Sequence, residues 1–163
     1  MSKIYVDEIL PKDNAKITAA DLQLPAGSVI QVQSRDYTGG EQSVTSTTYA
    51  TTNISHSITP KFANSKIVVI MSTNLRKANT DSSANFTMGL YRNGTLIRDK
   101  WQWAFGANSS SQHFGHWSAS YVDTPNSTSE QTYVLRGKSS NGGNFILGDT
   151  ASGGQVVLME IAQ

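Results

Sequence analysis

Short stretches of alternating apolar and polar residues, each closed by a turn signal, constrain the fold of this chain more than any other feature. The clearest stretch runs from Lys66 to Arg76. Ile67, Val69, Met71, Thr73 and Leu75 share one face of it, and all of them except Thr73 are apolar. Side chains on a strand alternate between the two faces of a sheet, so this period of two predicts a β-strand. Val68 and Ile70 are apolar as well, which predicts that the first half of the strand is covered on both faces.

Turn signals divide the rest of the chain into similar stretches. Asn93-Gly94 joins two of them and predicts a tight hairpin, because both turn residues must adopt positive φ. Pro60 ends another stretch, since proline cannot donate a hydrogen bond to a β-ladder. The predicted strands cover residues 29–34, 49–59, 66–76, 86–90, 96–105, 113–122, 132–138, 145–147 and 155–162, and residues 38–48 are predicted as a polar turn region.

The composition supports an all-β fold. Ser, Thr and Asn number 21, 16 and 11, and these residues disfavour long helices because they compete for backbone hydrogen bonds or branch at Cβ. Nine or ten short strands without a helix predict an antiparallel β-sandwich, for which the jelly roll is the commonest form at eight or more strands. The pattern does not determine the strand order.

Charge and residue counts exclude several function classes. Thirteen Lys and Arg against 12 Asp and Glu give a net charge of +1 with no basic stripe, so we expect no nucleic-acid partner. No apolar run approaches the roughly 18 residues of a membrane helix, so we expect no membrane insertion. The chain has no Cys, which excludes disulfides and thiol nucleophiles. No phosphate-binding glycine motif occurs, and we expect no cofactor.

Residues 1–27 differ from the rest and are predicted to be an extended N-terminal leader, followed by one sandwich domain over residues 28–163. The leader carries apolar residues at Ile4, Val6, Ile9 and Leu10 but is too short for a core of its own. It therefore packs on the body of the chain, on sister chains or on a partner protein, or it remains a loose tail.

Aromatic and polar side chains on neighbouring segments form the one candidate ligand site in the sequence. Aromatic faces flanked by amides and imidazoles suit sugars, because a ring covers the apolar C–H face while the polar groups bind hydroxyls. The candidate glycan-binding residues are Tyr91, Trp101, Trp103, His113 and His116. The alternative is that these rings fill the core or a subunit interface, which the alternation of Trp101 and Trp103 favours.

Patterns typical of enzymes and metal sites are missing from the sequence. His113 and His116 are three apart, so on a strand they point to opposite faces, and we expect no metal site. No pair of carboxylates stands out for acid–base catalysis, and no Gly-x-Ser-x-Gly motif occurs. We therefore expect a protein that is not an enzyme.

Four segments, in this order and spacing, carry a resemblance to a known family. They are residues 24–32 (LPAGSVIQV), residues 58–60 (ITP) with 65–69 (SKIVV), residues 121–125 (YVDTP) with 132–133 (TY), and residues 157–161 (VLMEI). Together they resemble small tail-fibre and related virion surface proteins of tailed bacteriophages. The resemblance covers roughly residues 24–163, and the segment KIYVDEI at residues 3–9 resembles the short leader of such proteins.

The resemblance implies a jelly-roll-like sandwich that assembles as a homotrimer on the virion. The leader, through Ile4, Val6, Ile9 and Leu10, would bind other virion structural proteins. The sandwich would contact polysaccharide of the host surface as part of a tail fibre. A capsid decoration protein, or another purely structural part of the virion, is the alternative function.

Overall fold

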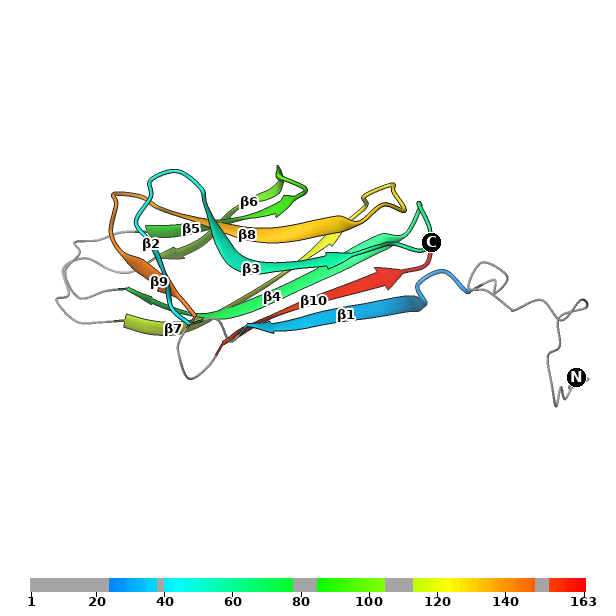
Figure 1. Cartoon of the computed structure of the whole chain (residues 1–163), viewed down its shortest axis with the longest axis horizontal. Coiled ribbons are helices and arrows are strands. Elements are labelled where there is room, and N and C mark those ends of the chain that lie inside the picture. The colour runs from blue at the N-terminus through cyan, green and yellow to red at the C-terminus, as the bar shows by residue number, and fades with distance from the viewer. Residues whose placement is uncertain (1–23, 38–39, 78–84, 105–112, 149–152) are drawn as a thin grey trace, which may run out of the picture.

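The computed structural model of the chain describes residues 24–37, 40–77, 85–104, 113–148 and 153–163 (Figure 1). These residues form ten β-strands and no helix, so no helix among them is long and apolar enough to cross a membrane. The strands are β1 (Val29–Tyr37), β2 (Gln42–Val44), β3 (Ala50–Ile58), β4 (Lys66–Lys77), β5 (Asn85–Arg92), β6 (Thr95–Ala104), β7 (His113–Asp123), β8 (Gln131–Ser139), β9 (Phe145–Leu147) and β10 (Gly154–Ile161).

The strands form two antiparallel sheets that pack face to face, with β2 and β9 as additions to the first (Figure 1). Sheet A has the order β1-β10-β4-β7, and sheet B has the order β3-β8-β5-β6. When β2 and β9 are left out and the other eight strands are numbered in chain order, sheet A has the order 1-8-3-6 and sheet B the order 2-7-4-5. This is the strand order of a jelly roll. The predicted all-β sandwich is confirmed.

The core lies between the two sheets and is built from the inward side chains of both. On β4 the buried positions are every second residue, as the alternation predicts. Within it, Phe86 from sheet B stacks on Phe145 from β9, with ring centroids 4.9 Å apart. Gly137 on β8 leaves room for the Phe86 ring, because a Cβ there would lie 2.3 Å from Phe86 Cζ. Each large apolar side chain buried here contributes about 1.5–3 kcal/mol.

The outward side chains of β4 are less covered than the sequence predicts. Val68 and Ile70 are only partly buried on the outer face of sheet A, so the described residues bury just one face of this strand. A second difference is β2, which lies in the region predicted as a polar turn. Val44 is 2% exposed and joins the core, which gives this short strand its place beside β9.

The Asn93-Gly94 hairpin joins β5 and β6 as predicted. Asn93 has φ 47° and Gly94 has φ 84°, both in the left-handed region. The Asn93 side-chain oxygen also accepts a hydrogen bond from the Thr132 backbone N–H at 2.8 Å, and the Asn93 backbone N–H donates to the Thr132 carbonyl at 2.9 Å. These bonds fasten the hairpin to β8, the neighbouring strand of sheet B.

Two buried carboxylates are satisfied by local donors. Glu160 on β10 accepts hydrogen bonds from the backbone N–H groups of Lys61 and Phe62, at 2.8 and 3.1 Å, and from the Gln31 amide at 2.6 Å. Burial acts to raise the pKa of Glu160, but these donors outweigh it and hold the pKa below its usual value.

The second buried carboxylate is Asp123, at the end of β7. It accepts from Arg92 Nη1 at 2.7 Å and from the Tyr133 hydroxyl at 2.8 Å. Burial and the Asp123 carboxylate raise the pKa of Tyr133. Because Arg92 and Tyr133 belong to sheet B and Asp123 to sheet A, the cluster ties the two sheets together.

The sandwich has two distinct ends. At one end, Gly27 donates to the Ala162 carbonyl and Ala162 donates to the Ser28 carbonyl, each at 2.9 Å, so the described N-terminal residues lie beside the C-terminus (Figure 1). We call this the leader end. At the opposite, distal end, β9 pairs with the last three residues of β4. The 12 residues of β4 connect the two ends and span about 40 Å at the usual strand rise.

Candidate functional site

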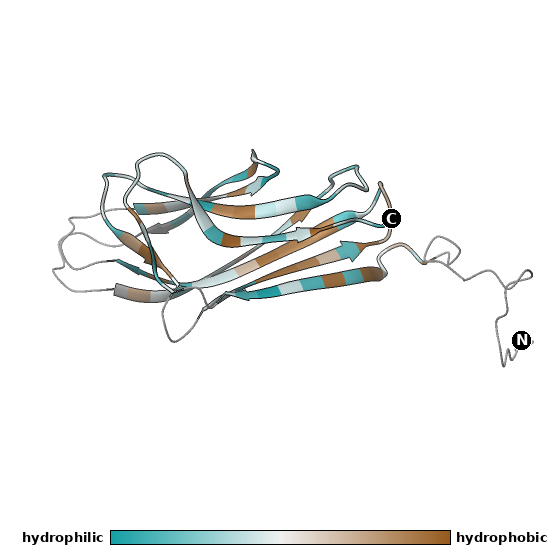
Figure 2. Ribbon diagram, in the orientation of Figure 1, coloured by the Kyte–Doolittle hydropathy of each residue, from teal (hydrophilic) through white to brown (hydrophobic). Residues whose placement is uncertain are grey.

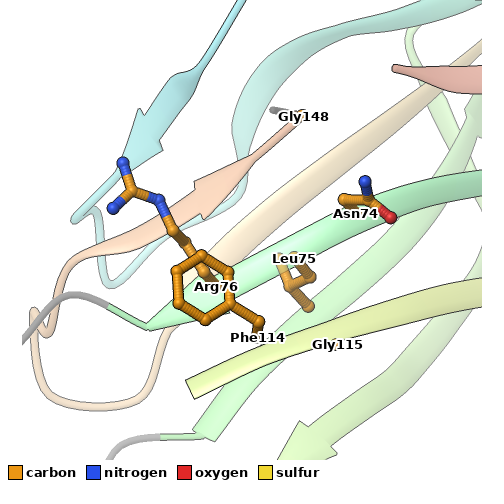
Figure 3. A pocket seen from close by; sticks show the side chains of 6 residues that line it. All are labelled: Asn74, Leu75, Arg76, Phe114, Gly115 and Gly148. Atoms are coloured by element: carbon orange, nitrogen blue, oxygen red, sulfur yellow. The ribbon is translucent and has the colours of Figure 1, made fainter. Parts of the chain in front are cut away.

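A pocket of about 300 Å³ opens on the outer face of sheet A near the distal end. We call it the distal pocket. It is lined by Asn74, Leu75 and Arg76 of β4, Phe114 and Gly115 of β7, and Gly148 just after β9 (Figure 3). Its volume lies at the lower limit for sites that hold small ligands.

The pairing of β4 with β7 places an aromatic ring beside a guanidinium group. Arg76 is the register partner of Phe114, so both side chains project from the same outward face. The Arg76 Cζ atom lies 6.0 Å from the Phe114 ring centroid, and Figure 3 shows the ring in front of the Arg76 side chain. Phe114 is 66% exposed, the largest exposed fraction among the large apolar residues of the described chain.

Arg76 is held in place from its other side. Its Nη2 atom forms an ion pair with Glu41, which precedes β2. Its Nε atom is buried and has no hydrogen-bond acceptor among the described residues. Buried donors are nearly always paired, so this unpaired N–H is an exception.

Asn74 adds an amide to the pocket, and an imidazole lies next to it. His116 is the register partner of Asn74, and its Nδ1 atom lies 3.1 Å from Asn74 Oδ1. Two of the lining residues, Gly115 and Gly148, have no side chain to cover the backbone on the pocket wall. At Gly148 no other residue fits, because φ is 72° and a Cβ would lie 2.9 Å from the Gly40 carbonyl oxygen.

The arrangement is suited to a neutral polar ligand that has one apolar face. An exposed ring offers a stacking surface, and a guanidinium, an amide and an imidazole offer hydrogen bonds around it. Sugars combine these two properties. None of the six lining residues is a carboxylate, and the described part of the chain contains no group of three or more His, Cys, Asp or Glu that could hold a metal ion.

The structure separates the candidate residues that the sequence brings together. Tyr91 is buried on the outer face of sheet B, where Arg136 lies 4.2 Å above its ring and Tyr49 packs edge-on at 5.8 Å. His116 lies on the outer face of sheet A, on the opposite side of the sandwich. A single site that includes both residues therefore does not form.

Trp101 takes the core position that the alternative interpretation gives it. Its ring packs against that of Trp117 from sheet A at a centroid distance of 5.6 Å, and it contacts the core cluster. The backbone of Trp103 pairs with Phe86, and His113 begins β7, but both side chains lie outside the described residues. The leader residues Ile4, Val6, Ile9 and Leu10 also lie outside them.

Sequence reasoning identified His116 but missed Phe114, Arg76 and Asn74. A signal was present. In the stretch 113–122, Trp117 and Tyr121 mark the inward face, so Phe114 is the one aromatic ring on the opposite face of this strand. Arg76 and Asn74 carry no such signal, because only the register of β4 with β7 brings them to Phe114.

No protein-family model matches the sequence, and no curated protein matches it significantly. Solved structures match only distantly. One is a chain of the T13 IBDV viral particle, with 9% identity and a TM-score of 0.49 over 83% of this chain. This chain spans only 36% of that viral-particle chain.

Two further solved structures match over most of their own length. One is the Eiger TNF from S. frugiperda, with 6% identity and a TM-score of 0.42, covering 79% of this chain and 96% of the other. Another is the CBM22-1 xylan-binding domain of Paenibacillus barcinonensis Xyn10C, with 14% identity and a TM-score of 0.38, covering 85% and 97%. At these scores the comparisons carry no argument about function.

Proposed function

We propose that this chain is a non-enzymatic virion protein of a tailed bacteriophage, a homotrimeric tail fibre that contacts glycan on the host surface. In this function the leader binds the particle through Ile4, Val6, Ile9 and Leu10. The distal pocket holds a sugar unit, with its apolar face on Phe114.

One observation carries the proposal. The leader joins the sandwich at one end, and the distal pocket opens near the other, about 30 Å away along β4 at the usual strand rise. A protein attached by its leader therefore presents the pocket away from its attachment point. This polarity is what contact between a particle and a cell surface requires.

The chemistry of the pocket supports a glycan rather than a protein ligand. Its exposed apolar surface is essentially one aromatic ring surrounded by hydrogen-bonding groups, whereas a protein interface needs about 800 Å² of each partner. Phe114 and Arg76 supply the ring and the charged donor, and Asn74 supplies an amide. The resemblance in the sequence supports the virion and the trimer.

Binding of the full-length protein to an array of bacterial surface polysaccharides tests the proposal. We expect at least one polysaccharide to bind, and Phe114→Ala to weaken that binding by about 2- to 12-fold, the equivalent of 0.5–1.5 kcal/mol for an aromatic contact. The matched control is Val122→Ala, which shortens another exposed apolar side chain on the same face of β7 at the other end. Its affinity should equal that of the wild type.

Three results would contradict this proposal. An intact protein that binds no polysaccharide of its host would favour the alternative, a capsid decoration or other structural component, whose deletion weakens particles without changing adsorption. A monomer in light scattering at the concentrations used for binding would contradict the homotrimer. Equal loss of affinity in Phe114→Ala and Val122→Ala would mean that the ligand binds elsewhere.

A further inference from the structure

An apolar row crosses all four long strands of sheet A on its outer face, near the leader end. Val32 of β1 pairs with Met159 of β10, Met159 with Val68 of β4, and Val68 with Val122 of β7. Residues in direct register share a face, so the four side chains lie side by side. Val32 and Val122 are 53% and 54% exposed.

Two neighbouring rows extend this apolar area. Val157 pairs with Ile70 on one side, and Val29 pairs with Ile161 on the other. Figure 2 shows apolar stretches, coloured brown, on β1, β4 and β10 toward the end where the C-terminus lies. We call the area the outer apolar patch, and it consists of Val29, Val32, Val68, Ile70, Val122, Val157, Met159 and Ile161.

Polar residues border the patch. Ser34 lies beside Val157 and Ser120 beside Ile70. The next row toward the distal end contains Asp36, Gln155 and Ser72. Apolar patches bordered in this way usually mark a surface that another segment or molecule covers. No described residue covers this one.

The size of the patch favours a short segment over a second copy of the protein. Four strands at about 4.8 Å and three rows at about 6.8 Å give roughly 14 Å in each direction between the outer Cα atoms. A few hundred square ångströms result, whereas a stable dimer needs about 800 Å² from each partner. An extended segment of about seven residues covers such an area.

The leader supplies a segment of this kind at the right place. Residues 4–10 contain four aliphatic residues, of which Ile4 and Val6 share one face when the chain is extended. The described chain begins at Leu24, only five residues before Val29 in the patch. The 18 residues between Leu10 and Val29 span up to about 60 Å when extended, several times the width of the patch.

We propose that residues 4–10 of the leader cover the outer apolar patch of the same chain. The proposal goes beyond the function above, because it concerns the protein before it meets the particle. The aliphatic side chains that would bind the particle are sheltered on the sandwich until then. When the leader leaves the sandwich to bind the particle, the patch becomes exposed at the same time.

Oxidation of Met159 by hydrogen peroxide reports whether the patch is covered. The full-length protein has four methionines, and Met71 and Met88 are fully buried, so they serve as internal references. We compare the wild type with a variant in which the four aliphatic leader residues (Ile4, Val6, Ile9 and Leu10) are replaced by serine. Met159 should oxidise about threefold faster or more in this variant, because oxidation follows exposure.

The matched control replaces Lys3, Lys12 and Lys16 by serine, which changes the leader without touching its aliphatic residues. Met159 in this control should oxidise at the wild-type rate. An equal Met159 rate in the wild type and in the aliphatic variant overturns the proposal. Wild-type protection that is lost on dilution also overturns it, since a second copy would then be the cover.

A cysteine pair identifies the segment and the chain to which it belongs. Because the protein has no cysteine, Val6→Cys with Val122→Cys permits one disulfide, and we expect it to form within a single chain under mild oxidation. The control pair is Val6→Cys with Ser118→Cys, on the same face of β7 but beyond the patch. Equal yields for both pairs, or disulfide-linked dimers, contradict the proposal.

Discussion

The stability of Gly137→Ala tests whether packing outweighs backbone propensity at this position. Replacing a strand glycine by alanine ordinarily stabilises a protein by about 0.4–1 kcal/mol, because it reduces the freedom of the unfolded chain. At Gly137 the added Cβ would lie 2.3 and 2.8 Å from two atoms of the Phe86 ring. Packing and propensity therefore predict opposite signs for one methyl group.

The structure gives the expected magnitude. The Phe86 ring would have to withdraw by about 1 Å to reach ordinary contact, yet it is fully buried and stacked on Phe145. Overpacking of this kind costs about 1–3 kcal/mol. After the gain from the unfolded chain, a net loss of roughly 1–2 kcal/mol remains, or about 2–8 °C in Tm for a chain of this length.

Urea unfolding followed by tryptophan fluorescence measures this loss. Gly89→Ala is the control on the adjacent strand, where a Cβ would meet the Leu96 side chain at 3.0 Å and the Tyr49 ring at 3.2 Å. Leu96 is 39% exposed and can move, so we expect a smaller loss there. A Gly137→Ala protein as stable as the wild type would refute the packing argument.

Three further predictions concern polar groups. The pKa of Glu160 is lower in the folded protein than in the unfolded chain. The contribution of Glu160 to stability is therefore complete above the unfolded pKa of about 4.3 and is lost as pH falls through the folded pKa. Glu160→Gln should flatten the acid side of a stability–pH profile. Tyr133→Phe removes one of two donors to buried Asp123 and should cost about 1.5–3 kcal/mol in urea unfolding. Both Asn93→Ala and Asn93→Gly remove the side-chain amide that bonds to Thr132, but only alanine keeps a Cβ at φ 47°. Asn93→Ala should therefore lower Tm more than Asn93→Gly, since glycine accepts this φ at no steric cost. Equal Tm values would contradict the role of backbone conformation.

The period-two pattern predicted the strands other than β2, because most strands of the sandwich bury mainly one face. Alternation along β4, β8 and β10 corresponds to alternate burial, and the hairpin at Asn93-Gly94 has the predicted positive φ angles. Alternation does not reveal which face is inward. On β10 the buried face includes the charged Glu160, whereas Val157 and Met159 face outward.

The candidate site could not be predicted in the same way, because it depends on pairing between distant strands. Trp101 and His116 were grouped by their closeness in sequence, yet one belongs to the core and the other to the outer face of sheet A. Arg76 and Phe114 are 38 positions apart in the chain and meet only through the register of β4 with β7. Register is set by the whole sheet, so no local pattern contains it.

The position of β10 has a consequence for how the protein is made. Sheet B is complete once residue 139 has been synthesised, but β10 lies between β1 and β4 and is synthesised after the other strands of the sandwich. Until then β1 has no partner, and one edge of β4 is largely unpaired, which invites pairing with other chains. Translation that stops before β10 therefore releases a chain with one sheet formed and the other open.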